Sequence, residues 1–163
     1  MTRSTAVLAL ALLAALVAAG CGATPTQARQ VDPDQPIVMT TETLDWQPGP
    51  PDLPPGAEFA VLEGNPVEGA FALRLRLPAD YRIPSHAHSL IENVTVISGA
   101  LHVGNGDKLD TSRGVRVPAG GFVSLAKGGN HYAWTEAPAV VQIHSDRPFD
   151  IVYVDPHDDP RRQ

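Results

Sequence analysis

Three histidines and one glutamate in this sequence could together bind a divalent metal. Within Ile83–Glu92, His86 and His88 are two residues apart, so on an extended chain both side chains project to one side. Glu92 shares that parity unless a bend near Ser89 shifts the register. Imidazole and carboxylate groups that converge in this way suit iron, manganese, zinc, nickel or copper. A fourth ligand must come from elsewhere, and His131 follows a glycine-rich turn at the start of another short apolar segment. The alternative is that His86 and His88 are exposed loop residues and Glu92 is a surface acid.

Strands have to hold these residues, and beyond Gly56 the hydrophobic pattern has the period of two that strands require. In Phe71–Leu77, leucines at every second position alternate with alanine or arginine. The sequence therefore predicts an all-β sandwich or small barrel of seven or eight short strands and no long helix. The expected strands are Glu58–Leu62, Phe71–Leu77, Ile91–Ile97, Leu101–Val103, Phe122–Leu125, Tyr132–Thr135, Val140–His144 and Asp150–Val154.

Composition excludes several classes of protein. The 163 residues are 43% hydrophobic and 18% charged, which fits one domain with a single core. The formal net charge of −6 provides no basic patch, so we expect no nucleic-acid partner. With one cysteine, the chain forms neither an internal disulfide framework nor a cysteine-only zinc site.

The single cysteine lies at the end of a segment typical of export. Arg3 precedes an apolar run, 6–19, which is shorter than the roughly 20 residues that a membrane-spanning helix needs. Small residues and then Cys21 follow, so residues 1–20 are predicted to be a secretory signal peptide.

The sequence Leu16–Cys21 resembles the lipobox of bacterial lipoproteins, with Ala18 where that motif usually has a larger aliphatic residue. The resemblance implies lipidation of Cys21 and a location in the bacterial cell envelope, exported and anchored to the membrane, because two acyl chains hold a protein stably. An ordinary signal peptide cut near Ala19 and an uncleaved anchor are the alternatives. Residues 21–36 are then a flexible linker, 37–56 a proline-rich extended strap, 57–156 the β-barrel and 157–163 a polar C-terminal tail.

Two longer patterns resemble the motifs of the cupin superfamily. His86-x-His88, three residues, Glu92, six residues and Gly99 have the spacing of the first motif, with Asp80 in place of its initial glycine. The second motif is similar to Gly120, five residues, Ala126, one residue, Gly128, two residues, His131, three residues and Thr135. Ala126 and Thr135 replace the customary proline and asparagine, and neither of these positions is a metal ligand.

The resemblance implies a single jelly-roll barrel with one divalent transition metal inside, bound by His86, His88, Glu92 and His131. This ligand set leaves about two of six octahedral positions for water, O₂ or a bidentate substrate. Iron or manganese is the favoured metal, and zinc, nickel and copper are alternatives.

Four further residues are candidates for lining the pocket. Gln142 and His144 share one parity in their strand, and they either lie beside the metal or form the solvent face of the sheet. Tyr132 and Trp134 follow His131 directly, and they either pack in the core or line the pocket.

The expected function is that of an envelope-anchored, metal-binding cupin that acts on or binds a small organic molecule. Because this fold supports many reactions, the reaction stays open, with dioxygenase-like chemistry favoured over isomerase or decarboxylase chemistry. The alternative is a non-catalytic module that binds or senses a small molecule or a metal. Pairing through sheet edges would give a homodimer.

Overall fold

The structure is a computed structural model that describes residue 34 and residues 36–162. The predicted signal peptide, Cys21 and nearly all of the predicted linker lie outside the described residues. In the described part of the chain, no helix is both long and apolar enough to cross a membrane.

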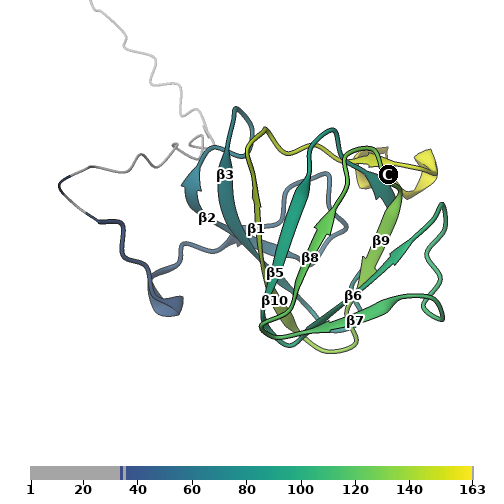
Figure 1. Ribbon diagram of the computed structural model, residues 1–163, viewed down its shortest axis with the longest axis horizontal. Helices are drawn as coiled ribbons and strands as arrows, with labels where there is room; N and C mark the ends of the chain where they lie inside the picture. Colours follow the sequence, from purple (N-terminus) through teal and green to yellow (C-terminus); the bar gives the residue numbers. More distant parts are fainter. Residues whose placement is uncertain (1–33, 35, 163) are drawn as a thin grey trace, which may run out of the picture.

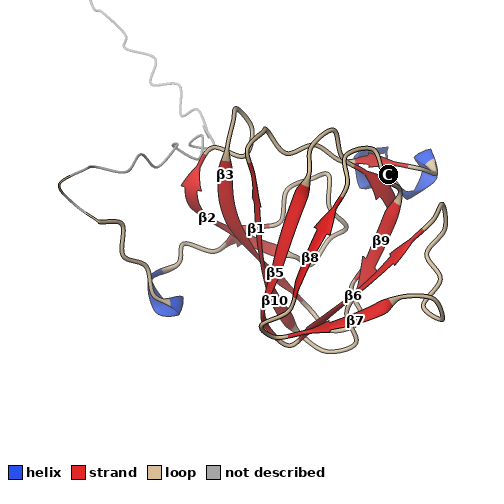
Figure 2. Ribbon diagram, in the orientation of Figure 1, coloured by secondary structure: helices blue, strands red, loops and turns tan. Residues whose placement is uncertain are grey.

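Two antiparallel sheets pack face to face, as the alternating pattern predicts (Figures 1 and 2). The first sheet has the order β1 (Gln47–Pro48), β2 (Glu58–Gly64), β3 (Phe71–Leu77), β10 (Ala139–Ser145), β5 (Glu92–Ser98) and β8 (Phe122–Leu125). The second sheet has the order β11 (Val152–Tyr153), β4 (Arg82–Ala87), β9 (His131–Trp134), β6 (Ala100–Asn105) and β7 (Val115–Pro118). The all-β prediction is confirmed.

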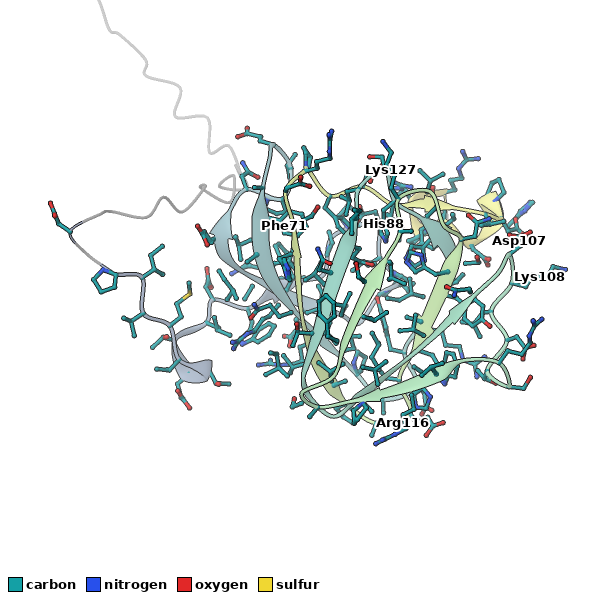
Figure 3. All side chains as sticks on the ribbon, in the orientation of Figure 1. Phe71, His88, Asp107, Lys108, Arg116 and Lys127 are labelled. Atoms are coloured by element: carbon teal, nitrogen blue, oxygen red, sulfur yellow. The ribbon has the colours of Figure 1, made fainter. Side chains whose placement is uncertain are left out.

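The core lies between the inner faces of the sheets. Leu73 and Leu75 on β3 pair in register with Ile143 and Val141 on β10, and all four side chains are buried. Arg74 is half-buried on the outer face of the same strand. Figure 3 shows His88 inside the outline of the barrel, whereas the labelled side chains of Lys108 and Arg116 lie at its edge.

The proline-rich strap packs on the barrel and also contributes β1, which pairs with β2. It has a short 3-10 helix, η1 (Thr41–Thr43), and it buries Leu44 and Leu53. At the other end of the chain, the predicted polar tail forms η2 (Pro156–Asp158) and η3 (Pro160–Arg162). Arg161 pairs with Asp159 at 2.8 and 2.9 Å. Arg161 also donates to the carbonyl of Ile151 at 3.2 Å, so the tail packs against the barrel.

Asp80, which replaces the first motif glycine, has φ of +57° and is the one non-glycine residue with positive φ in the described part of the chain. We expect Asp80→Gly to stabilise the protein by up to about 1 kcal/mol, because a left-handed conformation costs an L-residue roughly 1–2 kcal/mol and aspartate somewhat less. Ala79→Gly, the neighbouring control, is expected to destabilise by about 0.5 kcal/mol through unfolded-state entropy. Urea unfolding measures both, and equal effects of the two glycines would contradict this account.

Thr135, which replaces the motif asparagine, holds the same turn from the opposite side. Its hydroxyl donates to the carbonyl of Pro78 at 2.6 Å and accepts from the amide of Tyr81 at 3.2 Å, and the residue is 1% exposed. We expect Thr135→Val to lower the free energy of unfolding by about 1–3 kcal/mol, since it leaves the buried amide of Tyr81 unpaired, whereas the carbonyl of the exposed Pro78 can be hydrated. Thr135→Ser keeps the hydroxyl and should cost about 1 kcal/mol or less. Urea unfolding of the two variants compares them, and equal losses would mean that the hydroxyl contributes nothing.

Candidate metal centre

An irregularity in β4 aims one of the histidines at the interior. The pairing of β4 with β9 shifts register between Ile83 and His86, residues that a regular strand would point to opposite faces. Both side chains nevertheless line the same central cavity. Over this stretch β4 has one more residue than β9, and this extra residue reverses the alternation of side chains between the two faces. The hydroxyl of Ser85 donates to the carbonyl of Gly106, which secures this segment.

The four predicted ligands come from both sheets. His86 on β4 lies in register with His131 on β9, and His88 follows directly after β4. The chain then turns through residues 89–91 into the other sheet, where Glu92 is the first residue of β5. The structure therefore has the bend near Ser89 that the sequence left open, and the site joins β4 and β9 of one sheet to β5 of the other.

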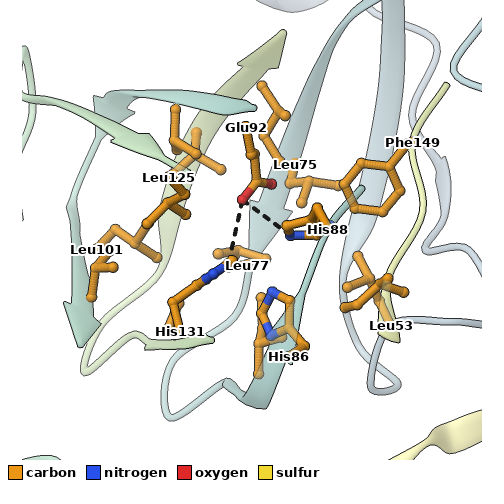
Figure 4. Close-up of a pocket in the computed structure, with 17 residues that line it drawn as sticks. Leu53, Leu75, Leu77, His86, His88, Glu92, Leu101, Leu125, His131 and Phe149 are labelled. Atoms are coloured by element: carbon orange, nitrogen blue, oxygen red, sulfur yellow. Dashed lines mark ion pairs between the residues drawn. The ribbon is translucent and has the colours of Figure 1, made fainter. Parts of the chain in front are cut away.

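The ligand atoms converge in the cavity (Figure 4). One nitrogen from each of His86, His88 and His131 lies within 4.8 Å of the others, and all three residues are buried. Oε2 of Glu92 lies 3.3 Å from Nε2 of His88 and 3.7 Å from Nε2 of His131. A single ion placed between these atoms would be within reach of three imidazoles and one carboxylate.

Backbone carbonyls fix the orientation of each imidazole. Nδ1 of His86 bonds the carbonyl of Pro84 at 2.7 Å, and Nδ1 of His131 bonds that of Gly129 at 2.9 Å. Nδ1 of His88 bonds the carbonyl of Asp150. Because a carbonyl only accepts, each Nδ1 must carry a proton, so Nε2 is the nitrogen with the free lone pair whenever the imidazole is neutral. This is the arrangement of metal-bound histidines.

The residues fit a bound metal. Nε2 of His88 and of His131 are buried and make no hydrogen bond, despite their nearness to Glu92. Orphaned buried polar atoms are uncommon and require an explanation. Oriented imidazoles with free Nε2 atoms beside a carboxylate are a donor set for a divalent transition metal.

The electrostatics of the metal-free site agree with this role. Burial, followed by the neighbouring His131 and His88, lowers the pKa of His86 to about 3, so this imidazole is neutral. Burial also disfavours a charge on His88, but the adjacent Glu92 carboxylate outweighs it and raises the pKa of His88. For Glu92, burial is opposed by His131 and His88, which together lower the pKa of the carboxyl group.

The cavity itself is small and apolar. It has a volume of about 40 Å³, which is room for an ion and very few waters. Apart from the four ligands, its lining is entirely aliphatic or aromatic: Leu53, Leu75, Leu77, Ile83, Val94, Leu101, Val103, Leu125, Ala133, Val141, Ile143, Phe149 and Ile151. Such walls exclude bulk water and strengthen electrostatic interactions at the centre.

Comparison with known proteins identifies the family of this fold. Residues 34–141 match the family described as the ChrR cupin-like domain. The chain belongs to this family. The cupin resemblance of the two sequence motifs, and with it the jelly-roll barrel, is thereby confirmed. No curated protein matches the chain.

Solved structures share the cupin fold at low sequence identity. A polyketide cyclase from Streptomyces resistomycificus has a TM-score of 0.59 at 14% identity, covering 77% of this chain and 89% of its own. A candidate acetylacetone dioxygenase from Methylibium petroleiphilum has a TM-score of 0.59 at 16% identity, covering 81% and 90%. The structure of Rhodobacter sphaeroides SigE in complex with the anti-sigma ChrR matches with a TM-score of 0.50 at 21% identity, covering 66% of this chain and 52% of that one.

The other pocket candidates of this cupin lie outside the metal cavity. Gln142 and His144 occupy the outer face of β10, opposite the inward Val141 and Ile143. Gln142 accepts a hydrogen bond from Arg74 at 3.3 Å, and His144 is exposed. Gln142 and His144 therefore share a parity because both lie on the solvent face of the sheet.

Tyr132 and Trp134 also face away from the metal, because the inward positions of β9 belong to His131 and Ala133. Their rings stack with centroids 6.1 Å apart, and the Tyr132 hydroxyl donates to the carbonyl of Asp110 at 3.1 Å. Both side chains are buried under the segment that precedes β7.

Sequence reasoning missed the groups that position the ligands. The amide of Gly128 donates to the carbonyl of His88 at 2.8 Å and ties the two motifs together. The Phe149 ring packs against His88, with ring centroids 5.1 Å apart. Gly128 in its turn and Phe149 after a proline are both visible in the sequence, but neither residue type shows on its own that it contacts His88.

Proposed function

We propose that this protein is an envelope-anchored cupin that binds one divalent metal ion through His86, His88, Glu92 and His131 and acts on a small organic molecule. One observation carries this proposal: the buried Nε2 atoms of His88 and His131 lack a hydrogen-bond partner and converge beside Glu92, while the Nδ1 of each histidine is held by a backbone carbonyl. Iron or manganese suits this nitrogen and oxygen donor set.

The bound ion supplies Lewis-acid or redox chemistry, and dioxygen-dependent oxidation is the favoured form. The chain's own residues do the rest. Backbone carbonyls hold the three imidazoles in one tautomer, and Glu92 contributes negative charge that offsets the charge of the ion. The aliphatic wall keeps bulk water from the centre and limits the part of a substrate that reaches it to a small group.

Metal analysis of protein purified from its own envelope tests the proposal, because overexpression can load the wrong metal. About one iron or manganese per chain is expected, together with oxygen uptake when acetylacetone is supplied as a first probe. Acetylacetone is chosen because a candidate acetylacetone dioxygenase shares the fold. Bound zinc without oxygen uptake would contradict the dioxygenase form.

The anchor is tested separately. Cys21→Ser should move the protein from the membrane fraction to the soluble fraction, since the acylated thiol is lost. Unchanged membrane retention would contradict lipidation at this residue.

A second candidate function, non-catalytic sensing, is favoured by the match to the ChrR cupin-like domain and by the anti-sigma complex among the fold neighbours. A sensor would bind metal at the same residues with no turnover of any bound molecule. Stoichiometric metal without oxygen uptake, combined with a metal-dependent change in the proteins captured from envelope extracts, would support this second candidate.

A further inference from the structure

A second cavity, of about 350 Å³, lies between the first sheet and the proline-rich strap. Its volume is in the range of small-molecule sites. It is lined by Pro50, Asp52, Leu53, Phe59, Asn65, Pro66, Val67, Glu68, Leu73, Leu75, Ile143 and Phe149. Most of this lining is apolar, so an occupant must present an apolar body.

This strap cavity adjoins the metal cavity. Four residues line both spaces: Leu53, Leu75, Ile143 and Phe149. The Phe149 ring packs against His88 on one side and edge-on against Phe71, at a centroid distance of 6.1 Å, on the other. In Figure 4, Phe149 and Leu53 stand beside His88 at one side of the ligand cluster. A molecule in the strap cavity would therefore lie one layer of side chains from the metal.

Asp52 lines the strap cavity, and one of its carboxylate oxygens lacks a hydrogen-bond partner. Oδ1 of Asp52 is buried and makes no hydrogen bond. The nearby hydroxyls are used by backbone atoms, since Tyr153 donates to the carbonyl of Asp52 at 2.8 Å and Tyr81 donates to that of Pro54. Arg161 is engaged by Asp159 at 2.8 Å. A buried acceptor without a donor is costly, and a ligand that supplies a donor removes that cost.

The charge of the lining selects the kind of donor. Among the described residues that line the strap cavity, Asp52 and Glu68 are acidic and none is basic. An anion would meet two carboxylates, and the nearby Arg161, whose charge also acts on Asp52, is already paired with Asp159. A cation would be stabilised. A charged donor also forms a stronger bond to a carboxylate than a neutral donor does.

We propose that the strap cavity binds a small apolar amine, whose ammonium group pairs with the carboxylate of Asp52 and whose apolar body lies against Phe59, Leu73 and Phe149. This names the substrate class of the metal site, and in that respect it rests on the proposed function. The amine site itself requires no metal.

Three probes of similar shape test the proposal by calorimetry on metal-free protein: 2-phenylethylamine, 2-phenylethanol and 3-phenylpropionate. The amine should bind about tenfold more tightly than the alcohol, and the acid should not bind. Asp52→Asn should weaken the amine about tenfold or more and leave the alcohol unchanged. Glu68→Gln removes the same charge from an exposed rim position and should change amine binding less than threefold. Equal affinities for amine and alcohol, or an unchanged amine affinity in Asp52→Asn, would overturn the proposal.

A second variant keeps the test independent of Asp52. Val67 lines the cavity yet is 79% exposed, so Val67→Trp can close the cavity with little effect on folding and should abolish binding of both amine and alcohol. Retained binding would place the probes elsewhere and overturn the proposal.

In Mn²⁺-loaded protein, the NMR signals of bound 2-phenylethylamine should broaden. Amine binding without any metal uptake would contradict the proposed function alone, and binding of both without broadening would contradict the link between the two cavities.

Discussion

Replacing His131 by alanine is expected to weaken divalent-metal binding by more than about a hundredfold. Loss of a residue that merely orients a ligand typically costs 10–100-fold in metal affinity, and loss of the ligand itself should cost more. His131 is buried beside Glu92, so no water-exposed group replaces its nitrogen. Competition with a chromophoric chelator measures the dissociation constant of Mn²⁺ or Fe²⁺ for both proteins.

The matched control is His144→Ala, because His144 is a histidine of the same barrel on the outer face of β10. Its metal affinity should equal that of the wild type. Glu92→Gln should give an intermediate loss, since the amide oxygen can still bind the ion but lacks the negative charge. If His131→Ala and His144→Ala bound metal equally, the centre described above would be wrong.

Metal affinity is also expected to fall at least about tenfold for each pH unit below the pKa of His88. The sign follows from the metal-free protein, in which the Glu92 carboxylate outweighs burial and raises the pKa of His88. At lower pH the ion must displace that proton, which costs a factor of ten per unit for one proton. His86 adds no competition above about pH 4, because burial lowers its pKa to about 3.

Calorimetric titration in buffers of different ionisation enthalpy measures both the affinity and the protons released. Between pH 6 and pH 5, release of about one proton per ion is expected, the proton of His88. Replacing Glu92 by glutamine removes the charge that favours protonated His88, so the pH dependence of this variant should begin at a lower pH. A wild-type affinity that is constant from pH 7 to pH 5 would contradict the role of His88.

Sequence alone pointed to the four residues that the structure brings together, because histidine and glutamate are common metal donors and their spacing matched two linked motifs. Parity put three of them on one face of an extended segment, with a bend near Ser89 left open. In the structure His86 lies on β4, His88 directly follows it, and Glu92 begins β5 after a turn. Local parity could not show this, since the register shift after Ile83 and the turn before Glu92 depend on pairing with β9 and on the packing of the two sheets.

The prediction of the strands was limited in the same way, because local patterns do not show how strands pair. The alternating pattern of Phe71–Leu77 predicted β3 correctly, because one face is buried and the other is polar. Sequence reasoning missed β4, which contains Pro84 and an irregular register, and β7, a largely exposed edge strand with little amphipathic contrast. Asp52 was also missed, because an aspartate among prolines is typical of an exposed turn, and its burial depends on how the strap folds back.

The carbonyls that orient the three imidazoles have a consequence for how this site can evolve. Since the acceptors at Pro84, Gly129 and Asp150 are main-chain atoms, exchange of those side chains leaves every acceptor in place. Mutation can therefore reshape the surrounding walls, and with them the choice of ligand, without disturbing the tautomer of any imidazole. A lineage could diversify what it binds while inheriting one unchanged metal chemistry.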